Sequence, residues 1–418
     1  MGVNRTMREL PFGELVGSSA LTPSIAESKI GRELSFAEII GASDDGNSIR
    51  ETDFVRHFCA KHPLHIIQDD RARFEYLLSW RRLNELLSLN LLDRQRLRIT
   101  RDGRDVPPAF YRAENSDRDP VISSKLHDLI KQNASIVVNG AQYLSPPILR
   151  LALQMEMALN QKLNVNAYMT FGAGGAFAIH YDPHDVLVLQ VYGTKHWFVY
   201  ENSEPSPTKY EKATAKNPKD LPVAFETILQ AGDALYIPRG FYHRAAVTDT
   251  NSVHLTFGIN APKGVDFVDA IRDEIQKDVL FREDILTLRG PNALAEQERA
   301  LKARLCEMIN AAPLSDYLDE WQKSRKPINQ FRVGPREQLH DDTMLSPLLR
   351  YPGAWRHSVE KKGASPEPAA EAILDFLVHE RIATVGQIKA KFADIFPDDA
   401  ILANLGELID GSWIEVAR

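Results

Sequence analysis

The chain has few cysteines and no long apolar run. Only Cys59 and Cys306 occur among 418 residues, too few and too far apart for a disulfide framework or a pair of neighbouring zinc ligands. No stretch approaches the roughly 18 to 20 consecutive apolar residues of a membrane span, and no apolar segment follows a basic start at the N-terminus. We therefore expect a cytoplasmic protein with no membrane partner.

An excess of positive charge is also missing. Lysine and arginine total 50 against 57 aspartates and glutamates, which gives a net charge of -7. The summed field of such a chain opposes encounter with a polyphosphate and favours encounter with a basic molecule. We expect no direct DNA binding, and a partner that carries positive charge.

Apolar residues make up 44% of the chain, enough for two to four domains at roughly 150 residues each. We expect a flexible N-terminus over residues 1–31. Residues 32–262 are expected to hold a helical lead-in and then a strand-rich domain. Arg98 to Gly103 reads as a strand that enters a hairpin turn, because Asp-Gly is a strong hairpin signal.

Short strands separated by turns fill residues 166–260. Turn chemistry at Gly193-Thr194 and Gly232-Asp233 divides the strand-like runs. This spacing favours a sandwich or a barrel, and the jelly-roll (cupin) barrel is the version that carries ligands on its inner face. We predict an α+β protein built on this double-stranded β-helix. The expected strands are Ala176–Tyr181, Asp185–Tyr192, Lys195–Glu201, Thr227–Leu229, Ala234–Ile237 and Val253–Ile259.

After residue 262 the apolar residues recur at helical spacings. One such stripe includes Val268, Ile271 and Ile275, and a second runs from Leu301 to Ile309. These stripes either pack against the barrel or form a dimerisation unit, and their spacing alone does not distinguish the two roles. We assign residues 263–358 to this helical domain.

The last segment, residues 359–418, has the outline of a winged helix. It contains a linker, three short helices and a closing strand at Trp413 to Val416, and Thr384 and Gln387 are spaced as a capping box. Residues 366–418 hold ten acidic and four basic side chains, a charge of -6, which makes DNA binding implausible. We expect a role in protein contacts or packing.

Two histidines and an aspartate form the most informative pattern. His180 and Asp182 lie two residues apart, so on a strand they project to one face. His243 follows Pro238 and Gly240, residue types that form tight turns and let the chain bring His243 close to the other two ligands. Two imidazoles and one carboxylate suit Fe(II), Mn(II) or Zn(II), and form the facial triad of non-haem iron oxygenases.

Lys195 begins an otherwise apolar strand that offers no carboxylate as a counter-charge. Burying its ammonium there is costly unless an anion binds it, and the distal carboxylate of 2-oxoglutarate would serve. Such a charge-assisted bond is worth roughly 1.5 to 3 kcal/mol. The alternative is a solvated lysine at the end of a strand.

Further polar side chains accompany these four. Asn166 and Tyr168 share one face of the preceding strand and Thr256 lies on the last strand, so they either hold the same co-substrate or line the barrel. Since the triad is complete without them, three more histidines are assigned to the surface or to support of the ligands. These are His184, His196 and His254.

The sequence resembles the JmjC/cupin oxygenases, and within them the ribosomal oxygenase group. The resemblance rests on Asn166 to Thr170, Ala178 to Asp182 and Val188 to Trp197, with 15 residues from His180 to Lys195. It also covers the lead-in with Lys-His-Pro-Leu, the Leu280-Phe281-Arg282 region and the acidic terminal unit. It implies a catalytic domain over residues 32–262, a helical dimerisation domain and a winged-helix domain.

By this resemblance His180, Asp182 and His243 would bind Fe(II), and Lys195, Asn166, Tyr168 and Thr256 would hold 2-oxoglutarate. Dioxygen would then hydroxylate a substrate carbon while 2-oxoglutarate becomes succinate. The sequence departs from the family twice. Gly258 stands where some relatives have serine, and Lys195 stands where well-known bacterial relatives have arginine.

The leading hypothesis is a homodimeric hydroxylase of a protein side chain, with a basic ribosomal protein as substrate. Three alternatives remain: the same chemistry on a peptide or amino-acid unit in biosynthesis, N-methyl demethylation, and a non-catalytic cupin scaffold.

Overall fold

A computed structural model defines the fold and separates the chain into two compact units, residues 1–260 and 261–418. The described residues are 7–8, 34, 36–40, 54, 59, 61–101, 103–113, 119–172, 179–202, 204–208, 221–247, 251–285, 290–325, 338–351, 353–380 and 382–416. Within these residues no helix has both the length and the apolar character needed to cross a bilayer.

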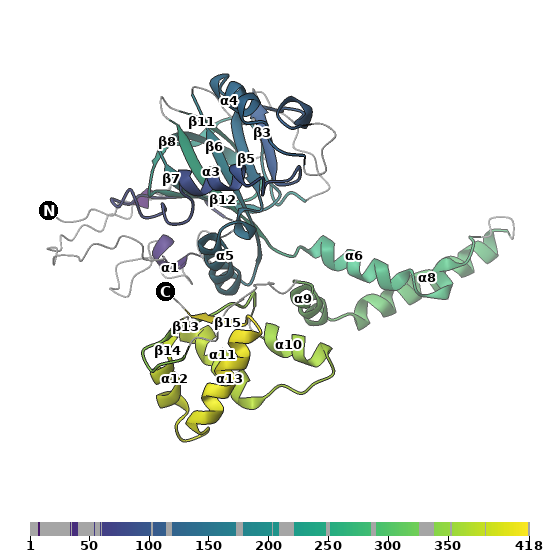
Figure 1. Cartoon of the computed structure of the whole chain (residues 1–418). Coiled ribbons are helices and arrows are strands. Elements are labelled where there is room, and N and C mark those ends of the chain that lie inside the picture. The colour runs from purple at the N-terminus through teal and green to yellow at the C-terminus, as the bar shows by residue number, and fades with distance from the viewer. Residues whose placement is uncertain are drawn as a thin grey trace. The chain divides into compact units, whose positions relative to one another are not determined.

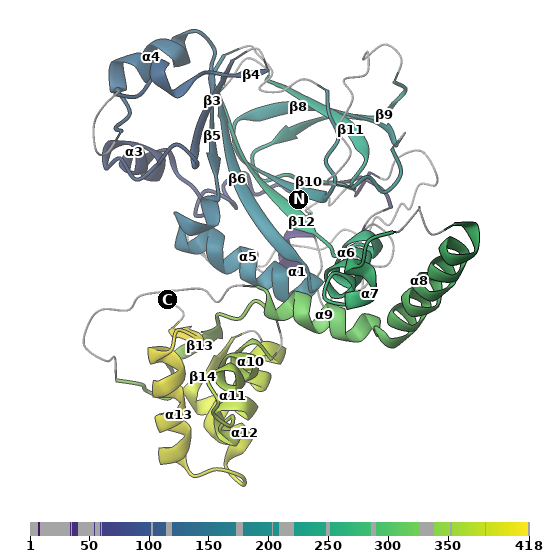
Figure 2. The ribbon, with the colours of Figure 1, turned by 90° about the vertical axis from the view of Figure 1, so that its right-hand side faces the viewer.

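A nine-stranded antiparallel sheet forms the framework of the first unit, with the order β1-β2-β10-β7-β12-β6-β5-β3-β4 (Figure 1). A second sheet, β11-β8-β9, faces its central strands (Figure 2). The strands are β1 Met7–Arg8, β2 Leu64–Ile66, β3 Leu97–Arg101, β4 Arg104–Asp105, β5 Ser135–Asn139, β6 Lys162–Thr170, β7 Asp185–Tyr192, β8 Thr194–Asn202, β9 Val223–Gln230, β10 Ala234–Ile237, β11 Phe241–Val247 and β12 Ser252–Asn260.

The central strands of the large sheet are apolar on both faces because each face packs against a different hydrophobic cluster. In β7, Leu187, Leu189 and Val191 belong to a large core that also contains residues of α3 and α5. Val186 and Val188 point to the other face and pack against residues of the small sheet, so β7 is apolar almost throughout. The helices of this unit are α1 Phe36–Ile39, α3 Trp80–Ser88, η1 Pro108–Phe110, α4 Ser123–Lys131, η2 Ala141–Tyr143 and α5 Pro146–Leu159.

The predicted jelly-roll barrel is confirmed, and β7 and β10 have the predicted bounds. The predicted hairpin is present as β3 and β4, with Gly103 in the left-handed region, while Asp102 lies outside the described residues. Residues 176–178 of the expected strand Ala176–Tyr181 lie outside the described residues. The prediction is wrong for residues 179–181, which form no strand and pair only through the isolated bridge between His180 and His243. Within the N-terminal segment expected to be flexible, Met7 and Arg8 instead pair with β2, because the backbone of β2 is free on that side.

The second unit begins with helices whose side chains are little buried. Only Ile271 is buried in α6 Gly264–Ile275, and no described residue is buried in the other three helices. The predicted apolar stripes form on these helices, but they are covered only in part. Ile271 is buried and Leu301, Leu305 and Met308 are half-buried, whereas Val268 and Ile309 expose 59% and 46% of their surface. The three helices are α7 Val279–Arg282, α8 Pro291–Ala311 and α9 Leu314–Lys323.

Four described helices, α10 to α13, and a three-stranded antiparallel sheet, β14-β13-β15, follow in the same unit. The predicted capping box is present, because Thr384 and Gln387 each accept the other's backbone N–H. The sheet includes a strand that precedes the expected linker at 359–370, so this subdomain starts earlier than residue 359. The elements are β13 Met344–Pro347, α10 Ala354–Lys361, α11 Pro368–Glu380, β14 Ala383–Thr384, α12 Val385–Phe392, α13 Asp398–Asp410 and β15 Ile414–Val416.

Candidate metal and co-substrate site

Residues from five segments line a cavity between the two sheets of the barrel. Strand alternation explains the selection: every second residue of β6, β8, β11 and β12 projects inward. The apolar residues of the same faces, among them Val199, Leu229 and Ile237, fill the rest of the interior. The cavity residues are Tyr168, His180, Asp182, Val186, Lys195, Trp197, His243, Ala245, His254 and Thr256.

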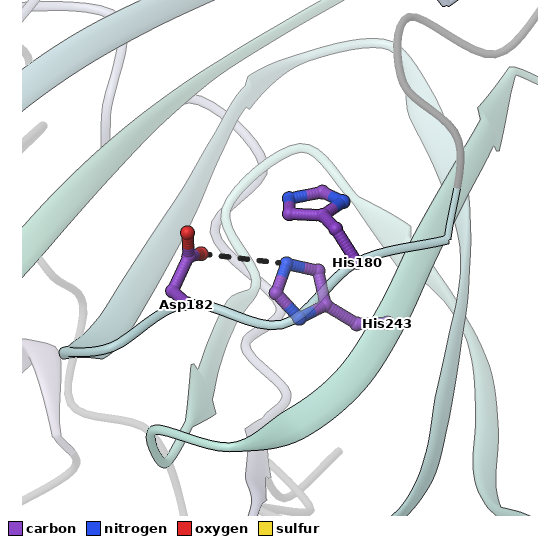
Figure 3. A group of neighbouring side chains, drawn as sticks. All are labelled: His180, Asp182 and His243. Carbon is purple, nitrogen blue, oxygen red and sulfur yellow. Dashed lines mark ion pairs between the residues drawn. The ribbon is translucent and has the colours of Figure 1, made fainter. Parts of the chain in front are cut away.

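The three predicted ligands meet at one point. One donor atom from each of His180, Asp182 and His243 lies within 4.8 Å of the other two. His243 Nε2 is 3.6 Å from Asp182 Oδ2, and the two imidazole centroids are 4.5 Å apart (Figure 3). Among the described residues this is the group of His, Cys, Asp and Glu whose geometry could hold an ion. Two nitrogens and one oxygen in this arrangement suit Fe(II), Mn(II) or Zn(II).

Backbone hydrogen bonds hold the segments that carry these ligands. His180 and His243 form an isolated antiparallel bridge, with N–H to O distances of 3.2 and 2.8 Å. Gly240, at φ +84°, donates its N–H to the carbonyl of Asp182 at 3.0 Å. The Pro238–Gly240 turn therefore lies close to the ligands, as predicted, and it contacts the backbone of Asp182.

The ring of His243 is prepared to act as a ligand. Its Nδ1 lies 3.0 Å from the carbonyl oxygen of Phe241, so Nδ1–H donates there and Nε2 keeps its lone pair toward Asp182. Burial, followed by the neighbouring His180, lowers the pKa of His243 to about 4. The imidazole is therefore neutral at physiological pH, as a metal ligand must be.

Lys195 is almost completely buried, with 1% of its surface exposed. Its Nζ donates to Thr170 Oγ1 at 3.2 Å and lies 3.4 Å from His254 Nδ1. No carboxylate of the described residues comes within ion-pair distance, and burial alone lowers the pKa of Lys195 to about 7. The solvated lysine considered from the sequence is thus wrong, and an anion entering the cavity would supply the missing counter-charge.

The turn before Lys195 places it there. Gly193 has φ +67°, and a Cβ at this position would come within 2.0 Å of the carbonyl oxygen of Asn251. Only glycine permits so close an approach, so the chain reverses tightly between β7 and β8. Lys195 consequently enters β8 with its side chain directed into the barrel.

The other predicted co-substrate residues lie on neighbouring strands. Thr256 of β12 pairs in register with Asn166 of β6, and His254 pairs with Tyr168 two residues further along. Thr256 and Tyr168 line the cavity. Asn166 does not appear among the lining residues, and its Oδ1 accepts the N–H of Gly140 at 3.2 Å.

His254 contributes more to the cavity than the sequence indicated. Its ring stacks on Tyr168, with centroids 4.9 Å apart and planes 6° apart, and it contacts Lys195. Burial lowers its pKa well below the usual value, so it is neutral and can accept from the Lys195 ammonium. The signal was available, because His254 and Thr256 are two residues apart and share the inner face of β12.

Asp185 connects the ligand segments to each other. Its buried carboxylate accepts the backbone N–H of Arg239 at 3.0 Å and the hydroxyl of Tyr236. Arg239 belongs to the turn whose Gly240 contacts Asp182, so Asp185 fixes this turn from the start of β7. Sequence analysis did not single out Asp185, since one carboxylate at a strand start has no distinctive spacing.

A larger cavity of about 260 Å³ lies on the opposite face of the large sheet. Leu78 and Trp80 cover it from one side, while Met169, Val191 and Val253 form its floor. Its titratable side chains, among the described residues, are Glu75, Arg81 and Tyr192. These side chains do not make up a metal ligand set.

A family model described as JmjC domain matches residues 141–267, the segment that contains the whole cavity lining. The chain carries a JmjC domain. The predicted resemblance to JmjC oxygenases of the ribosomal oxygenase group is confirmed by this match and by the relatives that follow.

Curated relatives are identical to this chain at about a quarter of the aligned positions. The bifunctional lysine-specific demethylase and histidyl-hydroxylase NO66 of Aedes aegypti is 26% identical, over 50% of this chain and 32% of its own. Ribosomal oxygenase 2 of Mus musculus is 27% identical, over 58% of this chain and 52% of its own. The chain thus spans between a third and about half the length of these two relatives.

The solved structure of ycfD from Escherichia coli has the same fold. It aligns with a TM-score of 0.51 over 88% of this chain and 99% of its own, at 17% sequence identity. At this identity the likeness concerns the fold alone, and it extends well beyond the JmjC segment.

Proposed function

We propose that this JmjC protein is an Fe(II)- and 2-oxoglutarate-dependent dioxygenase. The observation that carries the proposal is the position of a buried lysine in the same cavity as two histidines and an aspartate with converging donor atoms. Among the described residues this lysine has no carboxylate counter-ion. A metal triad alone would suit hydrolysis as well as oxidation. The lysine adds a site for a carboxylate, which a metal hydrolase has no need to bury.

The residues present fit both groups. His180, Asp182 and His243 would hold the metal, and Lys195 would pair with the distal carboxylate of 2-oxoglutarate, assisted by Tyr168 and Thr256. Asn166 would act at the edge of this set, since its amide oxygen accepts from Gly140. Bound iron, 2-oxoglutarate and dioxygen supply the oxidation of a substrate C–H bond. The chain orients the co-substrate and keeps water out of an apolar barrel interior.

The chemistry is tested by 2-oxoglutarate turnover to succinate in iron-loaded protein without added substrate. We expect slow uncoupled turnover in the wild type and none in His180→Ala, with metal content falling in parallel. His127→Ala, on helix α4 and outside the cavity, is the matched control. Equal turnover in wild type and His180→Ala would overturn the proposal and favour a non-catalytic scaffold.

We further propose a protein substrate, with a ribosomal protein first among the candidates. The name of the mouse relative and the net charge of -7 support this, because ribosomal proteins are largely basic. Incubation with ribosomal proteins should give a product heavier by one oxygen atom. Succinate formation without any such product would exclude this substrate and leave a biosynthetic peptide or amino acid.

N-methyl demethylation is a second candidate, since relatives such as that of Aedes aegypti are named as lysine-specific demethylases. The same oxidation of a methyl group releases formaldehyde. Methylated lysine peptides should therefore yield formaldehyde together with a loss of one methylene in mass. Hydroxylation without formaldehyde would decide against it.

A homodimer assembled through α6 to α9 is proposed because their apolar residues are exposed. Leu294, Ile309, Leu314 and Leu318 show 37% to 54% of their surface, and a partner helix pair would cover them. Sedimentation should show a dimer that Ile309→Glu disrupts. Glu296→Gln, on the same helix, is the control and should leave the dimer intact. A wild-type protein that sediments as a monomer would exclude the proposed dimer.

Residues 359–418, together with β13, are proposed to form a winged-helix unit for protein contact or packing. Three helices and a small antiparallel sheet support this assignment, and the segment charge of -6 opposes phosphate binding. Tight binding of the full chain to random duplex DNA at 0.15 M salt would contradict it.

A further inference from the structure

Trp197 presents a buried hydrogen-bond donor without an acceptor. The side chain lines the metal and co-substrate cavity, and only 5% of the residue is exposed. Its indole Nε1–H has no hydrogen-bond partner within the part of the chain that the structure describes. Buried tryptophan N–H groups normally find a partner, because an unsatisfied donor loses its hydration without compensation.

The position of the ring indicates what the missing acceptor is. The Trp197 ring lies between two histidines, with its centroid 6.1 Å from that of His243 and 5.7 Å from that of His254. His243 belongs to the metal triad, and His254 contacts the Lys195 ammonium. The indole therefore lies alongside the path from the metal ligands to the lysine.

Strand alternation places the two donors together. Lys195 and Trp197 are two residues apart on β8, so both project into the barrel. One is a buried ammonium without a carboxylate partner, and the other is a buried N–H without an acceptor. A single dicarboxylate in the cavity would satisfy both, since each carboxylate accepts several hydrogen bonds.

The apolar surroundings argue against a purely packing role. Trp197 belongs to a cluster with Val186, Val188, Val199 and Leu229, none of which offers a side-chain acceptor. Phenylalanine would fill such a position without burying a polar atom. A donor in this place is therefore costly unless a ligand uses it.

We propose that Trp197 binds the co-substrate, with its indole N–H donating a hydrogen bond to a carboxylate oxygen of 2-oxoglutarate. The inference rests on the proposed function and adds a neutral donor to the ammonium of Lys195. In this role Trp197 recognises the position of the carboxylate, whereas Lys195 recognises its charge.

The first test measures binding of 2-oxoglutarate to zinc-loaded protein by calorimetry, where no turnover occurs. Trp197→Phe should weaken binding about 5- to 10-fold, the range of one lost hydrogen bond. Trp355→Phe, a comparably buried tryptophan of the other unit, is the matched control and should bind as the wild type does. Because phenylalanine is smaller, benzothienylalanine at position 197 provides a second variant that keeps the shape and removes only the N–H.

A spectroscopic measurement separates a hydrogen bond from a packing effect. With ¹⁵N-labelled tryptophan, the indole signal that disappears in Trp197→Phe should move downfield when 2-oxoglutarate is added. An unmoved signal, or a benzothienylalanine variant with wild-type affinity, would overturn the inference. If zinc-loaded wild type itself binds no 2-oxoglutarate, the proposed function fails first.

Discussion

The backbones of His180 and His243 are joined by two hydrogen bonds, one from each N–H to the carbonyl of the other residue. The residues are 63 positions apart in sequence, yet they form one rung of the barrel. Two ligands are thus fixed by main-chain contacts that do not depend on the ion. The metal-free protein should keep the site formed, and changes to ligand side chains should act on metal affinity more than on folding.

Asp182→Asn tests this separation. The exchange removes the negative ligand but keeps the side-chain size, so metal affinity should fall at least about 100-fold, given the cost of losing a charged ligand. The unfolding temperature of metal-free protein should change by no more than a few degrees. Added metal should raise that temperature in the wild type only. Asp128→Asn on α4 is the control, and a collapse of metal-free stability in Asp182→Asn would show that the carboxylate is structural.

Lys195 should make co-substrate binding depend on pH. Its pKa near 7 means that the free site loses its charge as pH rises above 7, while a bound dicarboxylate raises the pKa again. Binding should therefore take up a proton and weaken as pH increases from 7 to 9. Calorimetry in buffers of different ionisation heat measures the uptake. Lys195→Arg keeps its charge and should abolish it, whereas proton uptake that persists in this variant would assign it to another group.

The same lysine affects stability in the opposite direction. Between its folded pKa of about 7 and its ordinary value of 10.5, the unfolded chain binds the proton that the folded chain has lost. Stability of the empty protein should consequently rise with pH across this window. Lys195→Met should remove that rise, as measured by urea unfolding at several pH values. A wild type and variant with parallel pH profiles would contradict the assignment.

Asp185 should support metal binding without touching the metal. Replacing it with alanine frees the N–H of Arg239 and the hydroxyl of Tyr236, so the turn that holds Asp182 loosens. We expect about a 10- to 100-fold loss of metal affinity, typical of residues that orient ligands. Tyr236→Phe removes one of the two bonds and should give a smaller loss. Unchanged metal affinity in Asp185→Ala would show that the turn is held by other contacts.

Gly258 and His184 should be coupled. A Cβ on Gly258 would lie 2.8 Å from His184 Nε2, so Gly258→Ser forces the imidazole to move. We expect destabilisation of about 1 to 3 kcal/mol, the usual range for overpacking. His184→Ala should relieve most of it, and a double-mutant cycle by chemical unfolding measures the coupling. Additive effects would mean that serine fits without displacing the ring. In this chain His184 occupies the space that a side chain at position 258 would need.

Sequence patterns were sufficient where a residue's role depends on its near neighbours. The bounds of β7 and β10 follow from apolar runs between turn residues. His180 and Asp182 were recognised from their two-residue spacing, although the structure holds His180 in an isolated bridge and not in a strand. Long-range pairing was not accessible in this way. Asp233, recognised only as a turn residue, is buried against His65, which lies 168 positions earlier. β3 pairs with β5, and β5 pairs with β6, and no local sequence pattern predicts these pairings.

The cavity shows the same division. Lys195 was recognised because an ammonium in an apolar strand is conspicuous. That no carboxylate of the described residues pairs with it depends on which residues surround it after folding. Trp197 and His254 look like ordinary strand residues in the sequence. Their function becomes visible when β8 and β12 bring them to the same side of the barrel.

The large sheet draws strands from well before the segment that the JmjC model matches. β2, β3 and β5 all precede residue 141, and β2 pairs with β10 at the very strand that leads to His243. An expression fragment cut to residues 141–267 would expose the flanks of β6 and β10 to solvent and leave the floor of the barrel open. A fragment meant to keep the complete large sheet should therefore begin upstream of Leu64, well before the segment that the JmjC model matches.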